Sequence, residues 1–279
     1  MTYRRSIYYL LAYSVSAFTP PPIIQRMSSS LASSSSSSIS SMDAIMENLP
    51  TPLILGSGSF TRKLILKEMG IDFSVIKRPI DEQGIGDRET DTPHDLVLSL
   101  AKAKCAHLVQ ELLVEDRCSE DELMVLESIT TTATTSSTGP SFLVLTGDQV
   151  VTHAGKILEK PETVQEAKSF CARYADAPPS TVGSCVIHHV PSGIQVSGVD
   201  SSTIYFRPSI ADIVNGKDLV DRLLETDAPI LDCAGGLMIE HPLVQEHLER
   251  IDGTEDSVMG LSKDLVKRLL LELKRKLKE

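Results

Sequence analysis

Short apolar runs alternate with segments of helical periodicity from residue 51 to the end of the chain. Each run has the length of a buried strand and is bounded by turn-forming or polar residues. Strands are predicted over 52–55, 73–76, 142–145, 181–188 and 198–206. No run reaches the roughly 18 apolar residues that a membrane span requires, so we expect no membrane association of the mature protein.

Apolar residues three or four positions apart predict helices between and after these strands. The predicted helices cover 62–69, 93–113, 162–174 and 210–224, the last despite Gly216. Near the C-terminus, a stripe of leucines lies on one helical face: Leu265, Leu269, Leu273 and Leu277. Strands that alternate with helices predict an α/β fold with a mixed central sheet and helices on both faces.

The N-terminal segment 1–49 has a different composition from the rest. It carries Arg4, Arg5 and Arg26, has no acidic residue before Asp43, and includes the serine run 33–38. A basic start, a short apolar stretch and a small-residue cleavage context indicate a targeting presequence. The order resembles the bipartite plastid presequences of algae with complex plastids, in which a phenylalanine such as Phe18 follows the cut. The alternative is a disordered serine-rich tail on a cytoplasmic protein.

A second segment, 115–141, interrupts the pattern inside the predicted domain 50–279. Residues 128–141 are almost all serine and threonine, with Gly139 and Pro140. Because a compact pattern resumes directly afterwards, we expect a low-complexity surface insertion rather than a linker between domains.

Composition limits the functions that remain. The chain of 279 residues has 38 acidic and 27 basic residues, a formal net charge of −11, which opposes binding to polymeric nucleic acid. A small anionic substrate would therefore need a locally basic pocket. The five cysteines stand far apart, without the paired spacing of a zinc site or a redox motif, and we expect reduced, mostly buried thiols.

The first candidate site is the turn after the first predicted strand. Ser57 and Ser59 can donate hydrogen bonds there, the following helix start presents free N–H groups, and Arg62 and Lys63 add positive charge. This combination suits a bound phosphate. Its alternative is an ordinary capped helix with solvated basic residues.

Two further segments carry candidate groups. Asp148 follows a predicted strand, where a carboxylate can hold Mg²⁺ or accept a proton from water, although Gly147-Asp148 also suits a plain turn. Lys104 in a predicted helix and Lys160 before Pro161 could reach phosphates. Isolated lysines more often face solvent.

Together, these segments resemble the Maf family from Leu53 to Leu273. The matching motifs are Ser57 to Lys63, Asp81-Glu82, Lys104, Thr146-Gly147-Asp148, Glu159-Lys160-Pro161, Ala234-Gly235 and Ser257 to Leu261. The chain departs from the family in the residue before Asp148 and in Glu159, where the family has glycine. The sequence of segment 241–249 also differs from that of the family, so the resemblance does not define the shape of the pocket rim.

The resemblance implies a Maf/ITPase-like fold with two lobes around a nucleotide cleft. It also implies hydrolysis of a nucleoside triphosphate to the monophosphate and pyrophosphate, as house-cleaning of non-canonical nucleotides by a homodimer. Asp148 and Glu82 would hold Mg²⁺ or Mn²⁺, and Asp148 would accept the proton from water. The phosphate-binding residues would be Ser57, Ser59, Arg62, Lys63, Lys104 and Lys160.

The base-specificity positions favour one subtype. Thr61, Gln149, Cys233 and Glu240 all differ from the subtype that acts on dTTP and UTP. Asp148-Gln149 with the downstream Glu240, together with Cys233-Ala234-Gly235, instead resembles the 7-methyl-GTP subtype. A carboxylate at Glu240 can accept two hydrogen bonds from guanine and attract the cationic methylated base. Glu240 with His241 could instead cap a turn before Pro242. A dTTP/UTP pyrophosphatase, or a non-catalytic nucleotide-binding regulator of cell division, remains the alternative.

Overall fold

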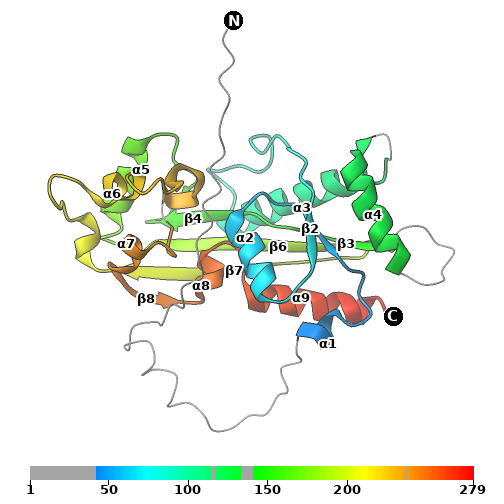
Figure 1. Cartoon of the computed structure of the whole chain (residues 1–279). Helices are drawn as coiled ribbons and strands as arrows, with labels where there is room; N and C mark the ends of the chain where they lie inside the picture. The colour runs from blue at the N-terminus through cyan, green and yellow to red at the C-terminus, as the bar shows by residue number, and fades with distance from the viewer. Residues whose placement is uncertain (1–41, 115–116, 133–140, 237) are drawn as a thin grey trace, which may run out of the picture. The chain divides into compact units, whose positions relative to one another are not determined.

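A single mixed sheet organises the protein. The computed structural model describes residues 42–114, 117–132, 141–236 and 238–279, which belong to one compact unit. The sheet has eight strands in the order β2-β1-β3-β6-β4-β5, with β7 beside β6 and β8 beside β7 (Figure 1). The strands are β1 (Leu53–Leu55), β2 (Phe73–Val75), β3 (Phe142–Thr146), β4 (Gln149–His153), β5 (Lys156–Leu158), β6 (Ser180–Val190), β7 (Gln195–Phe206) and β8 (Leu248–Asp252).

The helices are α1 (Met42–Met46), α2 (Phe60–Glu68), α3 (Pro93–Leu112), α4 (Glu120–Thr132), α5 (Val164–Arg173), α6 (Leu219–Leu224), α7 (Pro242–Gln245), α8 (Glu255–Val258) and α9 (Lys263–Lys276). Three short 3₁₀ turns complete the described elements: η3 (Pro208–Ala211), η4 (Ile230–Asp232) and η5 (Ala234–Gly236). The five predicted strands and four of the predicted helices are confirmed, with ends shifted by a few residues.

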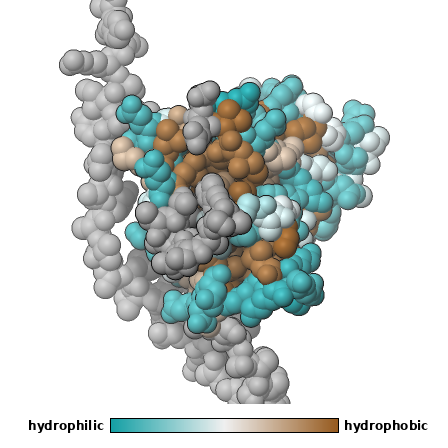
Figure 2. Space-filling view, turned by 90° about the vertical axis from the view of Figure 1, so that its right-hand side faces the viewer, coloured by the Kyte–Doolittle hydropathy of each residue, from teal (hydrophilic) through white to brown (hydrophobic). Residues whose placement is uncertain are grey.

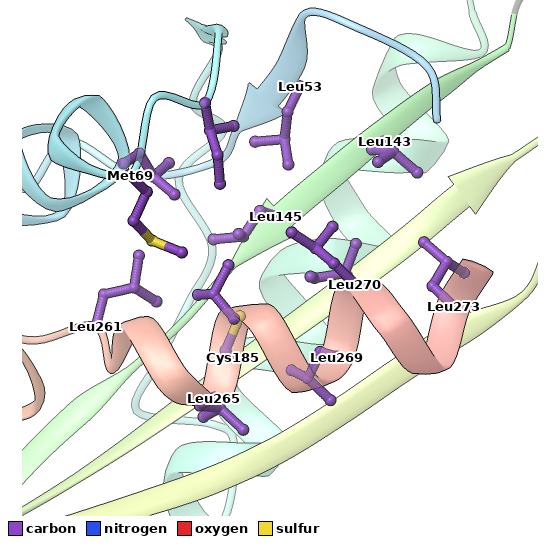
Figure 3. Packing of buried hydrophobic residues seen from close by; sticks show 14 of the residues in the cluster. Leu53, Met69, Leu143, Leu145, Cys185, Leu261, Leu265, Leu269, Leu270 and Leu273 are labelled. Carbon is purple, nitrogen blue, oxygen red and sulfur yellow. The ribbon is translucent and has the colours of Figure 1, made fainter. Parts of the chain in front are cut away.

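Alternating residues of the central strands pack against different helices. Leu143 and Leu145 of β3 join a core cluster with α2 and α9, whereas Val144 joins a cluster with α3. Figure 3 shows the first cluster, in which Leu265, Leu269 and other α9 residues pack beneath the sheet. Since successive side chains of a strand point to opposite faces, α9 and α3 cover opposite sides. The prediction of a mixed sheet with helices on both faces is confirmed.

The sheet has two halves that share β6 and β7. Strands β3 and β4 pair with β6 in one continuous antiparallel register, with Thr146 opposite Val186 and Gln149 opposite Gly183. Beside β3 lie β1 and β2; beside β4 lies β5. A separate apolar cluster built on α5, α6 and the end of β7 covers the β4 half. The two halves correspond to the two lobes that the family resemblance implies.

The predicted helix over 210–224 is wrong. The structure has η3, then a turn closed by backbone pairing of Val214 with Lys217, and only then α6. Asn215 and Gly216 have φ values of 54° and 78°, a left-handed conformation that breaks the helix. Asp218 then caps α6 with a reciprocal capping box.

The fold begins before residue 50, earlier than the expected boundary. Ile45 of α1 is 2% exposed and joins the same cluster as α9, and Lys274 Nζ donates to Ala44 O at 2.8 Å. The rest of the expected presequence, 1–41, lies outside the described residues. Within 42–114, 117–132, 141–236 and 238–279, no helix combines the length and apolarity needed to cross a bilayer.

The segment predicted as a low-complexity insertion contains the helix α4, which the sequence pattern did not predict. Val125 and Leu126 of α4 are partly buried against the α3 cluster, while Met124 is 62% exposed. Figure 2 looks onto this end of the molecule, where hydrophobic residues lie among hydrophilic ones. Residues 133–140, within the Ser/Thr-rich stretch, lie outside the described part.

The cysteines are free thiols, as expected. Three of the five are buried, and burial raises the pKa of Cys105 to about 11 and of Cys171 and Cys185 to about 12. These thiols are therefore protonated at neutral pH and act as small apolar groups.

Candidate active site

The turn between β1 and α2, residues 56–59, is called the anion turn after the phosphate site predicted there, and it lies beside the junction of β3 and β4. Gly56 N donates to Leu145 O at 2.8 Å, which continues the parallel pairing of β1 with β3 by one residue. A Cβ atom at residue 56 would lie 2.8 Å from both Leu108 and Thr146 side-chain carbons, so only glycine fits. Ser59 then caps α2 by accepting a bond from Arg62 N. The turn is fixed by backbone pairing on one side and a helix cap on the other.

Arg62 links three segments around this turn. Its guanidinium donates to Ser57 Oγ at 3.2 Å, Gly147 O at 2.9 Å and Gly260 O at 2.9 Å. Burial lowers the pKa of Arg62, and the negative charges of Asp148 and Glu82 oppose that shift. The arginine thus has a clear structural role in addition to its positive charge beside the turn.

Asp148 lies where β3 passes into β4. Its side chain is 12% exposed, and its backbone is held to β6 by Asp148 N donating to Ser184 Oγ at 3.1 Å and Ser184 N donating to Asp148 O at 2.8 Å. A Cβ atom at residue 147 would lie 2.5 Å from Ser184 O. Gly147 therefore permits the close approach of strands that positions Asp148.

One ammonium group joins the two predicted acidic residues. Lys104 Nζ from α3 lies 2.6 Å from Asp148 Oδ1 and 3.0 Å from Glu82 Oε1. Lys104 is 19% exposed and Glu82 49% exposed at the side chain, so solvent reaches the group from the Glu82 side. Three predicted site residues, distant in sequence, are brought into direct contact.

The loop that carries Glu82 also reaches the β5 end. Arg88 donates to Ile85 O at 2.6 Å and Glu82 O at 2.9 Å, and its guanidinium lies 3.5 Å from Glu159 Oε1. Lys160 follows Glu159 and lines a cavity of about 280 Å³ together with Arg88. Sequence reasoning missed Arg88, since nothing in its own segment links it to Glu159.

The predicted specificity residues lie in different surroundings. Gln149 Nε2 donates to Ser257 O and Val258 O, both at 3.0 Å, so this side-chain amide holds the C-terminal end of α8, just before Gly260. Thr61 Oγ1 lies 2.9 Å from Ser59 Oγ in the anion turn. Both residues support the frame of the site in this structure.

Glu240 lies near Cys233 in the β4 half. Burial raises the pKa of Glu240, and burial together with the nearby negative charges of Glu240 and Asp232 raises the pKa of Cys233 to about 11, against the opposing charge of Lys160. His241, not Glu240, caps α7, through Nδ1 accepting from Leu243 N. Glu240 makes no ion pair within the described residues, so its carboxylate can accept bonds from a ligand.

The remaining predicted phosphate-binding residue, Lys63, lies on the first turn of α2 and is partly exposed. A cation that the sequence analysis did not identify, Lys77, lies against the same turn. A Cβ atom at Gly58 would be 3.4 Å from Lys77 Nζ. Its only sequence signal is its position five residues before Glu82.

Comparison with known proteins identifies the family of this chain. The family model described as Maf-like protein matches residues 52–273. Over 80% of this chain and 97% of the relative, the sequence is 32% identical to a 7-methyl-GTP pyrophosphatase of Dictyostelium discoideum. It is 27% identical to a dTTP/UTP pyrophosphatase of Salinibacter ruber over 76% of this chain and 86% of that protein.

A 7-methyl-GTP pyrophosphatase of Pseudomonas syringae pv. tomato is 25% identical over 67% of this chain and 79% of its own length. The matched region includes the anion turn, the Lys104 contact and the Glu240 segment, and the resemblance inferred from the motifs is confirmed. The chain belongs to the family of Maf-like proteins.

Proposed function

We propose that the protein hydrolyses a nucleoside triphosphate to the monophosphate and pyrophosphate. The observation that carries the proposal is the contact of Lys104 with both Asp148 and Glu82, beside which Arg62 joins Ser57 of the turn to Gly147. Acidic and basic groups brought together in this way can bind a metal-associated polyanion, a combination that a general binding surface would not require. The names of the relatives support the same reaction class.

Asp148 and Glu82 suit a hard divalent cation. Within the described ranges, no group of three or more His, Cys, Asp and Glu side chains forms a metal site. Mg²⁺ commonly takes one or two carboxylates and completes its shell with water and substrate phosphate. We therefore propose that Asp148 and Glu82 would hold Mg²⁺ or Mn²⁺, which would neutralise phosphate charge and polarise the attacked phosphorus.

The chain's own residues supply the remaining steps. Lys104 would exchange its carboxylate partners for phosphate oxygens when the triphosphate binds. Asp148 would accept the proton of the attacking water, because its side chain is 12% exposed and its backbone is fixed by Ser184. Ser57, Ser59, Arg62, Lys63 and Lys160 would bind the phosphates and the leaving pyrophosphate, Arg62 chiefly by holding the turn.

We propose that the base is 7-methylguanine. Glu240 is a half-buried carboxylate without an ion-pair partner in the described chain, and guanine offers it two donors while N7-methylation adds a positive charge. Two of the relatives reported above carry the name 7-methyl-GTP pyrophosphatase. Thr61 and Gln149 would affect base selectivity indirectly, by holding Ser59 and the end of α8 in place.

The test is pyrophosphate release from a panel of ordinary and methylated triphosphates with Mg²⁺, Mn²⁺ or chelator. We expect metal-dependent release, fastest with 7-methyl-GTP. Faster turnover of dTTP or UTP would favour the second candidate, supported by the relative from Salinibacter ruber. Tight nucleotide binding without release would identify a non-catalytic regulator.

Two further proposals concern the context of the enzyme. We propose a homodimer, which light scattering of the purified protein would test.

We also propose plastid import through the basic and serine-rich N-terminal segment, with cleavage before Met42, since α1 packs on α9. A fluorescent fusion of residues 1–41 in an alga with a complex plastid distinguishes this from a cytoplasmic protein.

A further inference from the structure

Lys77 is a cation placed beside the anion turn. It follows β2 and is exposed, and the virtual Cβ at Gly58 lies 3.3 Å from its Cδ and 3.4 Å from its Nζ. Because Gly58 has no side chain, the Lys77 side chain can lie against the turn at this residue. Lys77 forms no ion pair within the described residues, in contrast to Lys104, which contacts two carboxylates.

The next residue, Arg78, anchors the segment after β2 that contains Lys77. Arg78 Nη1 donates to Glu122 Oε1 at 2.7 Å, and Nη2 donates to Glu122 Oε2 at 2.8 Å. Its guanidinium also donates to Lys77 O at 3.0 Å and Arg117 O at 3.1 Å. A bidentate pair with these backbone bonds fixes the orientation of the chain at Lys77.

Glu122 belongs to α4, inside the inserted segment. Its side chain is 20% exposed and also accepts a bond from Ser119 N at 2.9 Å. The hydrogen bonds from Arg78 lower the pKa of Glu122 to about 2, so the pair stays ionised at neutral pH. Partly buried Val125 and Leu126 hold the same helix on the α3 cluster.

We infer that Lys77 is a further phosphate-binding residue and that Glu122 of the inserted helix positions it through Arg78. The inference rests on the proposed function, since it assigns Lys77 to the same triphosphate. Lys77 supplies an unpaired positive charge at the turn, opposite in sign to Asp148 and Glu82. The insertion thereby contributes to substrate binding without touching the substrate.

The first test compares Lys77→Gln and Lys77→Arg with Lys67→Gln, an exposed lysine elsewhere on α2. The probe is inorganic tripolyphosphate in calorimetric titration, alongside steady-state kinetics. Lys77→Gln should weaken tripolyphosphate binding and raise KM about tenfold, with kcat changed less than about threefold. Lys77→Arg and Lys67→Gln should stay near wild type.

The second test measures the coupling to α4. Glu122→Gln and Arg78→Gln should each weaken tripolyphosphate binding about threefold, and the double variant should be no worse than the single ones. The preference for 7-methyl-GTP over GTP should not change. A positioning role predicts this pattern, whereas general loss of structure would lower kcat and base preference together, as thermal melting would reveal.

The outcomes separate this inference from the proposed reaction. Equal tripolyphosphate binding by wild type and Lys77→Gln would overturn the role of Lys77. This result would not contradict the proposed pyrophosphatase reaction. Wild-type protein that binds tripolyphosphate through Lys77 but releases no pyrophosphate overturns the reaction and keeps the inference. Wild-type protein that does not bind tripolyphosphate overturns the inference.

Discussion

The two ends of the site differ in how their charges are satisfied. At the β1–β3 end, Asp148 and Glu82 are paired with Lys104, and Arg62 is hydrogen-bonded to backbone carbonyls. At the β4–β5 end, Glu240 has no ion-pair partner within the described residues, and burial raises its pKa. The charges of the first end are paired within the protein, whereas under the proposed function Glu240 would gain its partner from the ligand. Reaction and selectivity should therefore respond to different substitutions.

The largest effect is expected from Asp148→Asn. The amide keeps the shape of the side chain but cannot accept the proton of water or neutralise a cation in the same way, so kcat should fall about 10²- to 10⁴-fold. Pyrophosphate release measures the loss. The preference between 7-methyl-GTP and UTP in the residual activity should stay constant; a shift in that preference would show that the two ends are not separable.

Glu240→Gln should affect the other end. The amide removes the negative charge that attracts a methylated guanine, so the 7-methyl-GTP to UTP ratio of kcat/KM should fall about tenfold or more. Turnover of a poor substrate such as UTP should be retained. An unchanged ratio would contradict the assignment of Glu240 to the base.

Gly235→Ala should destabilise the Glu240 end through packing. Gly235 has φ +69°, and an added Cβ would lie 2.7 Å from Tyr174 Oη and 2.8 Å from Val151 Cγ2. The free energy of unfolding should fall by about 1–3 kcal/mol in chemical denaturation. Gly155→Ala is the matched control, with φ +77° and no atom within 4 Å, and should cost about 1 kcal/mol from backbone strain alone.

The smallest effect concerns pH. Because burial raises the pKa of Glu240, its carboxylate is protonated, and loses its charge, at a higher pH than an exposed glutamate with a pKa of about 4.3. The KM for 7-methyl-GTP should rise a few-fold as pH falls through this range. The same titration of Glu240→Gln should be flat, and a slope that persists in this variant would assign the effect to another group.

The sequence predicted the buried frame better than the loops that complete the site. Asp148 was identifiable because a strand and a glycine precede it, and Ser57 and Ser59 because they end a strand before a helix. The contact of Lys104 with Asp148 and Glu82 was inferred only by resemblance, since periodicity places residues on faces but does not join distant segments.

The failures have local physical causes. The helix α4 was missed because its C-terminal end merges into serines and threonines, and its stability comes from packing on α3 and from the Arg78 pair. Two left-handed residues, Asn215 and Gly216, divided the helix predicted over 210–224. The phosphate-binding role inferred for Lys77 depends on its position beside Gly58, which is 19 residues earlier in the chain. No local sequence pattern indicates that contact.

The unbroken pairing of β6 with both β3 and β4 has a consequence for substrate length. The turn between β1 and α2 is bonded to β3, and Gly235, before Glu240, packs against Val151 of β4. Because β6 pairs with both β3 and β4, the sheet helps to set the span between the proposed phosphate-binding turn and Glu240. Under the proposed function, a nucleotide would have to extend far enough to contact both. A nucleoside diphosphate should then be unable to contact Glu240 and all of the phosphate-binding residues at once. The rigid sheet would therefore make the protein selective for the length of the phosphate chain.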